Sequence, residues 1–280
     1  MEKTTLTVND FNLKYSFESG QPLSFYADFL NNELAYTAKN HIVNIKQENN
    51  KIILKSDDII FAKKELISRF RLKDPMKTIY NEISTDSFMA ESISRYKGLH
   101  ITLNDPWETL VVFIISQNNN IRNIRNSVLK LIELFGTETE FKTKNFPALN
   151  DLLNAKENDF KKCSVGFRAK YLKNAVDYCT NNLDLYKLKQ KDYETIVQEL
   201  LQVNGVGNKI ADCVALMGYG KLEAFPIDIW IKRILEKIYF KGNKTDIKIL
   251  KSFAMQKWEK YAGYAQQYLY WNARNNFNSY

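Results

Sequence analysis

The spacing of the apolar residues changes once along this 280-residue chain, close to Asp58. From residue 4 to about 56, apolar and polar residues alternate over short runs, as in Phe11 to Phe17. Alternation with period two is typical of strands with one buried face, so we predict an antiparallel sheet in this part of the chain. After Asp58 the apolar residues recur every three or four positions, which indicates helices.

These two patterns predict an α+β protein. Further strand-like runs lie near Leu23 to Phe29, His41 to Ile45 and Lys51 to Lys55. We expect an N-terminal, sheet-containing subdomain with its following helices over residues 1–100, and a mainly helical domain over residues 101–280. Because the sequence has no solenoid-length repeat and no low-complexity linker, the two parts should pack as one compact body.

One helix start is signalled clearly. Asp105 can cap the helix, Pro106 suits its first position, and Glu108 stands three residues after the cap. The apolar run from Leu110 to Ile115 follows and predicts a buried helix. It ends in the polar stretch Ser-Gln-Asn-Asn-Asn at 116–120, which must face solvent or a ligand because it is too polar for a core.

Composition indicates a folded chain with a polyanionic partner. Hydrophobic residues make up 45% of the sequence and the formal net charge is +8, which favours DNA or RNA, although many basic proteins bind neither. The cysteines, Cys163, Cys179 and Cys213, lie far apart without a Cys-x-x-Cys pair. This pattern argues against zinc, iron–sulfur clusters and disulfides, so we expect no cofactor and no catalytic metal.

No targeting or membrane segment is evident. The first residues contain no apolar core followed by a small-residue cleavage site, and the longest apolar run is too short to span a bilayer. We expect a cytoplasmic monomer without membrane contact, nucleoid-associated if the cell is prokaryotic.

The most informative segment runs from Leu200 to Cys213 and reads as a helix end, a Gly-x-Gly turn and a second helix. Gly205 and Gly207 would let the backbone approach a phosphate closely. The first amides of the second helix are unpaired within it, and with the helix dipole they form an anion site. A lone Gly-x-Gly is most often an ordinary turn. Here both flanks are helical and the chain is basic, which favours binding of the DNA backbone.

Lys209 stands in the first turn of that second helix. The positive end of the helix dipole and the nearby basic residues disfavour a charged ammonium there, and a neutral amine is a nucleophile suited to Schiff-base chemistry. A lysine that only pairs with phosphate fits the local sequence equally well. Asp228 directly precedes a predicted helix from Ile229 to Tyr239, where it can act as N-cap, as catalytic carboxylate, or as both.

At these residues the sequence resembles the helix-hairpin-helix superfamily of DNA glycosylases, with the hairpin at residues 195–218. The stretch Gly-Val-Gly-x-Lys-x-Ala-Asp-Cys is similar to the 8-oxoguanine DNA glycosylase/lyase branch. The resemblance implies an enzyme that excises an oxidised purine from double-stranded DNA and then nicks the strand. It implies Lys209 as the attacking amine and Asp228 as the catalytic carboxylate.

Other segments follow the family in order. The stretch from Asp105 to Asn120 implies Asn118 as the residue that fills the gap left by the extruded base. The run Val-Gly-Phe-Arg-Ala-Lys-Tyr at 165–171 implies Phe167 as an intercalating ring and Arg168 as a reader of the orphaned cytosine. Trp230 occupies a position where members often carry histidine, and we place it among the DNA contacts.

The resemblance also implies a base pocket. Gln266 would read the Watson–Crick edge, Tyr270 would stack on the base, and Cys213 would cover the opposite face. The Gly20 carbonyl would accept the proton that 8-oxoguanine, unlike guanine, carries on N7. Taken singly, these residues have plainer interpretations as surface or core side chains. Their joint occurrence favours the pocket, because a flipped base needs a filler, an edge reader and a stacking platform together.

Three positions depart from the family pattern. Asn123 stands where many members carry an arginine that helps to read the opposite cytosine, so we expect tolerance of other opposite bases. Trp230 replaces a histidine, and Gln21 is followed by Pro-Leu-Ser in place of an aromatic-rich stretch. The branch with a cysteine-rich C-terminal cluster is excluded, because no cysteine follows Cys213.

Two alternatives stay open on the sequence. A monofunctional alkylpurine glycosylase shares the scaffold but activates water and has no hairpin lysine. A non-enzymatic hairpin module would bind DNA only, and would have no use for Asp228, Gln266 or Tyr270.

Overall fold

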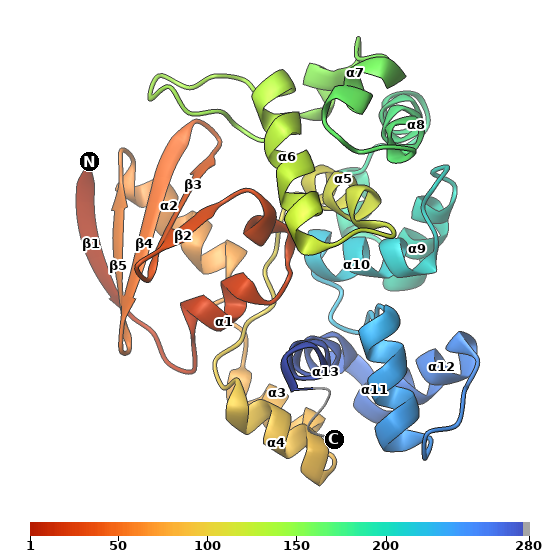
Figure 1. The fold of residues 1–280 in the computed structure, drawn as a ribbon. Coiled ribbons are helices and arrows are strands. Elements are labelled where there is room, and N and C mark those ends of the chain that lie inside the picture. Colours follow the sequence, from red (N-terminus) through yellow and green to blue (C-terminus); the bar gives the residue numbers. More distant parts are fainter. Residues whose placement is uncertain (277–280) are drawn as a thin grey trace.

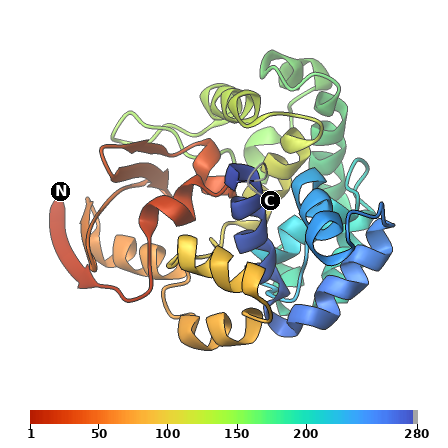
Figure 2. The ribbon, with the colours of Figure 1, turned by 60° about the horizontal axis from the view of Figure 1, so that its bottom comes forward.

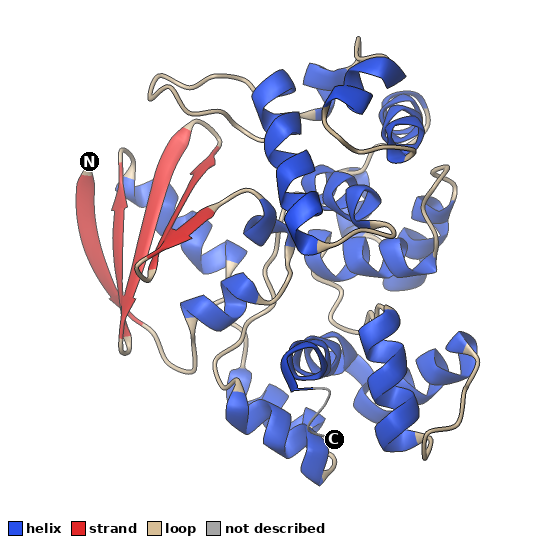
Figure 3. Ribbon diagram, viewed as in Figure 1, coloured by secondary structure: helices blue, strands red, loops and turns tan. Residues whose placement is uncertain are grey.

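The computed structural model describes residues 1–276. Its N-terminal part is a five-stranded antiparallel sheet with strand order β1-β5-β4-β3-β2, seen at the left of Figure 1 and in red in Figure 3. This confirms the predicted sheet. The strands are β1 (Glu2–Thr7), β2 (Asp28–Leu30), β3 (Glu33–Ala38), β4 (His41–Glu48) and β5 (Lys51–Ser56).

Helix α2 (Ile59–Arg69) covers one face of this sheet (Figure 1). Leu34, Ile45 and Leu54 lie opposite one another on three neighbouring strands and are fully buried, as is Leu66 of α2. The Asp58 carboxylate caps α2 by accepting hydrogen bonds from the amides of Ile60 and Phe61. The change of period near Asp58 therefore marks a real helix start.

The strand predicted for Phe11 to Phe17 is wrong. Residues Leu13–Glu18 form helix α1, whose buried side chains include Leu13 and Phe17. The side chain of Asn12 accepts a hydrogen bond from the Tyr15 amide at 2.9 Å. A capping side chain offers the backbone a helical alternative to a strand ladder, which the alternating apolar residues do not reveal.

The strand predicted for Leu23 to Phe29 is also largely wrong. The segment begins as the 3-10 helix η1 (Pro22–Phe25), and only β2, which starts at Asp28, joins the sheet. Pro22 stands at the helix start, where its fixed φ favours a helical turn and its missing N–H is not needed.

The rest of the chain is helical, as expected, and falls into two groups in Figure 1. The upper group includes α5 (Pro106–Ser116), α6 (Ile121–Phe135), α7 (Glu157–Lys162), α8 (Arg168–Asn181), α9 (Tyr193–Leu201) and α10 (Asn208–Gly218). The lower group includes α3 (Met76–Ile83), α4 (Ser87–Arg95), α11 (Ile229–Tyr239), α12 (Ile247–Trp258) and α13 (Ala262–Asn276). None of the helices in residues 1–276 is long and apolar enough to cross a membrane.

Helix α13 returns to the N-terminal half of the chain and packs beside α4 (Figure 2). The Gln267 amide donates to the Ser19 carbonyl at 2.8 Å, across 248 sequence positions. The Tyr268 hydroxyl donates to the Leu99 carbonyl at 3.1 Å. These bonds hold the Ser19 loop against α13.

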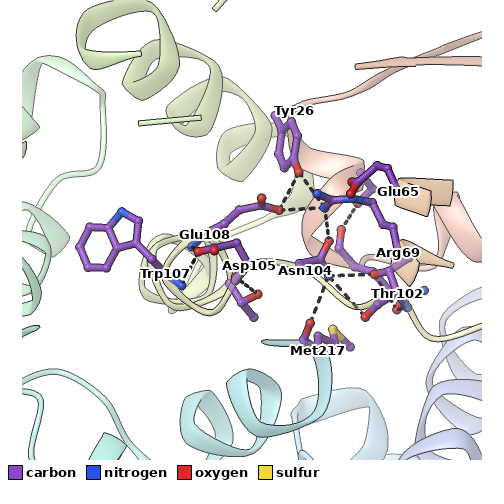
Figure 4. A network of polar contacts seen from close by, with 12 residues as sticks. Tyr26, Glu65, Arg69, Thr102, Asn104, Asp105, Trp107, Glu108 and Met217 are labelled. Atoms are coloured by element: carbon purple, nitrogen blue, oxygen red, sulfur yellow. Dashed lines mark hydrogen bonds and ion pairs between the residues drawn. The ribbon is translucent and has the colours of Figure 1, made fainter. Parts of the chain in front are cut away.

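A buried polar cluster, the Glu108 network, joins the sheet-containing part to α5 (Figure 4). Its members are Tyr26, Glu65, Arg69, Asn104 and Glu108. The Tyr26 hydroxyl donates to Glu108 at 2.6 Å, while the Arg69 guanidinium donates to Glu65 at 2.5 Å and to Asn104 at 2.9 Å. Burial raises the pKa of Glu108 to about 7, and the positive charge of Arg69 acts in the opposite direction.

Candidate active site

The predicted hairpin lies between α9 and α10. Gly205 has φ +93°, and a Cβ on it would lie 2.5 Å from the ring of Tyr171, so both the conformation and the space require glycine. Gly207 is the N-cap of α10, and apart from its neighbours along the chain no described residue has an atom within 4 Å of where its Cβ would be. A bound group can therefore approach the backbone at Gly207 closely.

Lys209 stands in the first turn of α10, as the sequence predicts. Its side chain is half-buried, and its ammonium lies 4.8 Å from the ring centroid of Phe113 on α5. The electron-rich face of an aromatic ring attracts a cation placed over it. Phe113 thus orients the amine of Lys209.

Asp228 is the N-cap of α11, and its carboxylate accepts a hydrogen bond from the Ile231 amide at 2.8 Å. The predicted cap is confirmed. Burial raises the pKa of Asp228, whereas the Ile231 hydrogen bond and the positive charge of Lys209 act against that rise. Lys209 and Asp228 therefore interact electrostatically while the carboxylate still caps its helix.

A pocket of about 610 Å³ brings most of the predicted site residues together. Its lining comes from the Ser19 loop, the end of α5 with the loop after it, α10, the start of α11, and α13. The predicted residues that line it are Gly20, Asn118, Lys209, Cys213, Asp228, Trp230, Gln266 and Tyr270.

The inner walls of this pocket have the chemistry expected for a planar base. Gln266 is 5% exposed, and among the described residues its side-chain oxygen has no hydrogen-bond partner. The Tyr270 ring packs against Gly20, where an added Cβ would lie 3.0 Å from the tyrosine hydroxyl. Burial raises the pKa of the Cys213 thiol to about 12, so this wall is neutral.

The loop after α5 carries Asn118, which is exposed and has φ +44°. Asparagine is one of the few residues that adopt this left-handed conformation readily. Arg168 donates to the backbone carbonyls of Gln117 and Asn118 in this loop and is 7% exposed. Reading of a cytosine by Arg168 stays a prediction, since these donors now hold the loop.

Phe167 lies outside the pocket, immediately before α8, and is 56% exposed. Its ring packs edge-on to Tyr171 at 6.0 Å, and the Arg168 guanidinium lies 4.5 Å from its centroid. The intercalation of this exposed ring stays a prediction. Trp230 lines the pocket, and the Arg233 guanidinium lies 5.6 Å from its ring centroid.

Two of the pocket residues that the sequence reasoning did not name are a ring and a cation beside the predicted groups. Phe113 lies under Lys209, and Arg274 lines the pocket beside Tyr270. Arg274 follows Tyr270 by one helical turn, a spacing that places both side chains on one face of a helix and so was a usable signal. Phe113 gave no such signal, because it stands within a continuous apolar run.

Within residues 1–276, no group of three or more histidine, cysteine, aspartate or glutamate side chains is placed to hold a metal ion. The functional groups that the pocket itself offers are an amine, a carboxylate, an amide and a phenol.

Comparison with known proteins identifies the family. A model of HhH-GPD superfamily base excision DNA repair proteins matches residues 111–260. The chain belongs to this superfamily. A second model, for the N-terminal domain of 8-oxoguanine DNA glycosylases, matches residues 3–110 and places the chain in that branch, as its sequence motifs predict.

Individual relatives agree with this membership of the HhH-GPD superfamily. A probable N-glycosylase/DNA lyase from Methanothermobacter thermautotrophicus is 29% identical over 230 residues, which cover 74% of this chain and 73% of that protein. The solved structure of MBOgg1 with a low-affinity DNA ligand is 34% identical, with a TM-score of 0.92 over 98% of this chain and 96% of that one. An 8-oxoguanine glycosylase/lyase of Clostridium acetobutylicum, bound to DNA, is 31% identical with a TM-score of 0.90 over 96% and 94%.

Proposed function

We propose that this protein is a bifunctional DNA glycosylase and abasic-site lyase that excises 8-oxoguanine from duplex DNA. The observation that carries the proposal is the composition of one pocket. It combines an amine, Lys209, a carboxylate, Asp228, and a buried amide oxygen of Gln266 that has no partner among the described residues. Branch membership and the DNA-bound relatives support the same activity.

The chemistry follows from the first two groups. After the Lys209 ammonium gives up a proton to solvent, its amine attacks C1′ of the flipped nucleotide, the N-glycosidic bond breaks, and the base leaves with the bonding electron pair. The carboxylate of Asp228 stabilises the positive charge that develops at the sugar. The attacking nitrogen then loses a proton and the C1′–O4′ bond breaks, with O4′ taking up a proton, so that the sugar ring opens and an imine forms at C1′. The imine makes the C2′ proton acidic, and removal of that proton expels the 3′ phosphate by β-elimination.

The remaining pocket groups bind the base before that step. The unpaired oxygen of Gln266 offers an acceptor to the N–H groups on the Watson–Crick edge of a purine. Tyr270 and Cys213 provide the two faces between which the ring stacks, and the Gly20 backbone stands at the edge of the tyrosine. A buried acceptor without a partner lowers the stability of the free protein. A ligand that supplies a donor removes this cost, and the free energy recovered favours binding.

The DNA backbone is held from the hairpin side. Gly207 leaves the first amides of α10 accessible to a phosphate, and Phe167 and Asn118 stand ready to occupy the space of the extruded nucleotide. We propose that the enzyme acts as a monomer in the compartment that contains the DNA.

Borohydride trapping tests the proposal. The wild type, incubated with an 8-oxoguanine duplex and borohydride, should form a covalent enzyme–DNA complex, and the Lys209→Gln variant should not. Base release without trapping would instead indicate the monofunctional alkylpurine glycosylase. Binding without any base release would indicate a non-enzymatic DNA-binding module. A panel of oxidised and alkylated purines in the same assay defines the lesion range.

A further inference from the structure

The base pocket contains a second cation that the mechanism above does not use. Arg274 lines the pocket from α13, one turn beyond Tyr270. Its guanidinium donates to the Tyr270 hydroxyl at 3.4 Å and lies 5.7 Å from the ring centroid of Trp271. Among the described residues that line the pocket, Lys209 and Arg274 are the cations and Asp228 is the anion.

The position of Arg274 within the pocket is set by its contact with Tyr270. The hydroxyl of Tyr270 is the end of the ring that abuts Gly20, where an added Cβ would lie 3.0 Å from the hydroxyl oxygen. The Arg274 guanidinium is bonded to that same hydroxyl. The Gly20 backbone and the Arg274 guanidinium therefore both lie near the hydroxyl end of the ring on which the base is expected to stack.

The backbone at this end is held in place. The Gln267 amide donates to the Ser19 carbonyl at 2.8 Å. The Gln21 amide donates to the carbonyls of Ser16 and His100, both at 2.9 Å. Gly20, between these anchored residues, has φ +74°, and its carbonyl accepts no hydrogen bond among the described residues. An anchored backbone acceptor and a guanidinium donor thus both belong to the part of the pocket around the Tyr270 hydroxyl.

We propose that Arg274 is a specificity-determining residue that donates a hydrogen bond to the C8 oxygen of the damaged base. This rests on the proposed function and deepens it. The five-membered ring of 8-oxoguanine presents a donor, N7–H, beside an acceptor, O8. Gly20 and Arg274 present the complementary acceptor and donor. Guanine presents an unprotonated N7, which is an acceptor, and a C8–H group. Its N7 would therefore face the Gly20 carbonyl with no proton between the two acceptors, and its C8 would offer no oxygen to the Arg274 guanidinium.

The magnitude of such a contact is large enough to measure. A hydrogen bond to a charged donor contributes about 1.5–3 kcal/mol, which corresponds to about 10- to 100-fold in affinity. A site built to hydrogen-bond a substrate group also rejects the analogue that lacks the group. Arg274 should therefore act on the ratio of lesion to guanine binding, because O8 is present in one base only.

The test measures equilibrium binding in the inactive Lys209→Gln background, on duplexes that contain 8-oxoguanine, guanine or an abasic-site analogue. We expect Arg274→Met to reduce the preference for 8-oxoguanine over guanine by about tenfold or more. Its binding to the abasic duplex should stay within a few-fold of the parent. Arg233→Met removes an exposed guanidinium near Trp230 and is the matched control for loss of one charge; it should leave the preference unchanged.

A second pair of variants keeps the test decisive if the methionine variant folds poorly. Arg274→Lys retains the charge without the planar fork and should lose part of the preference. Tyr270→Phe removes the hydroxyl that holds Arg274 but keeps the stacking ring, and should lower the preference by less than Arg274→Met does.

Two results would overturn the inference. An equal loss on all three duplexes, together with a salt dependence reduced by about one phosphate contact, would make Arg274 a backbone contact. An unchanged preference in Arg274→Met would exclude any reading of O8. Failure of the proposed function is distinguishable from both, because it would appear as no preference for 8-oxoguanine in the Lys209→Gln parent itself.

Discussion

The Glu108 network and the base pocket both bury polar side chains, but they differ in how many of their hydrogen bonds are made. In the network, Arg69 contacts Glu65, Asn104 and Glu108, and the Tyr26 hydroxyl also bonds Glu108. In the pocket, the oxygen of Gln266 has no partner among the described residues.

The difference separates a cluster that stabilises the fold from one that serves a ligand. A buried polar group without a partner costs about 1–3 kcal/mol, and a completed network removes that cost. The network joins α2 to α5, so its bonds hold the two halves of the molecule together. In the pocket, the free-energy cost of the unpaired Gln266 oxygen persists until a base binds. Substitutions in the network should therefore affect stability, and substitutions in the pocket should affect activity.

The largest effect is expected for Lys209→Gln, which should abolish both base excision and strand nicking. DNA affinity should stay within a few-fold, because the phosphate grip comes mainly from backbone amides. The melting temperature should be unchanged or slightly higher, since the substitution removes a charge from a functional pocket. Strand cleavage at a near-normal rate would reject Lys209 as the nucleophile.

Arg69→Met should produce the opposite phenotype. Removing Arg69 leaves the buried Glu108 and the partly buried Glu65 without their counter-charge, which costs about 3–5 kcal/mol of unfolding free energy. Chemical denaturation measures this loss, and the excision rate per folded molecule should stay close to that of the wild type. Lys173→Met breaks the exposed Lys173–Asp177 pair and is the control, with an expected loss of about 0–1 kcal/mol. A similar loss in both variants would contradict the distinction between the two clusters.

Asp228→Asn should slow excision by roughly two or more orders of magnitude, because the amide cannot stabilise positive charge at the sugar. The amide oxygen can still accept from Ile231, so the start of α11 should be retained. Asp246→Asn changes another capping aspartate, on α12, and should leave the rate unchanged. If Asp228→Asn lowers stability without a specific loss of rate, capping is its main role.

The pH profile sharpens this prediction. The active form of Asp228 is the carboxylate, and burial raises its pKa above the ordinary value of 3.8. The single-turnover rate of the wild type should therefore fall as the pH drops through this raised pKa, and the Asp228→Asn variant should lack this dependence. A wild-type profile that is flat on the acidic side would contradict it.

Tyr270→Ala should weaken binding of lesion DNA by about 10- to 100-fold, since stacking of a base contributes about 1–3 kcal/mol. Binding of undamaged DNA should change far less, because its bases stay in the duplex. Fluorescence anisotropy on both duplexes measures the difference. Equal losses on the two duplexes would show that Tyr270 supports the fold and does not bind the base.

The smallest effect concerns Arg168→Ala. A base-edge contact carries sequence information, so the variant should lose discrimination between opposite bases more than it loses total affinity. A uniform loss with all four opposite bases would fit its observed role as the residue that holds the Gln117 and Asn118 carbonyls. With Asn123 in place of an arginine, the wild type should accept bases other than cytosine. A preference for cytosine of roughly several hundred-fold would contradict this.

The sequence by itself determined the features that depend on neighbours along the chain. The N-caps Asp105 and Asp228 were predictable, because a cap is decided by a side chain and amides two or three residues away. The hairpin and the place of Lys209 in the first turn of α10 were predictable for the same reason. Local pattern gave the wrong prediction at Phe11 to Phe17. The period-two spacing there indicated a strand, but the segment forms a helix that Asn12 caps.

Only the tertiary structure decided which distant groups meet. Phe113 lies beneath Lys209 because α5 packs against α10, and no spacing along the sequence encodes that contact. Gly20 meets Tyr270 because α13 folds back on the N-terminal part of the chain. Whether Gln266 is paired and where the donors of Arg168 point are likewise outcomes of packing, since each depends on atoms brought close by the fold.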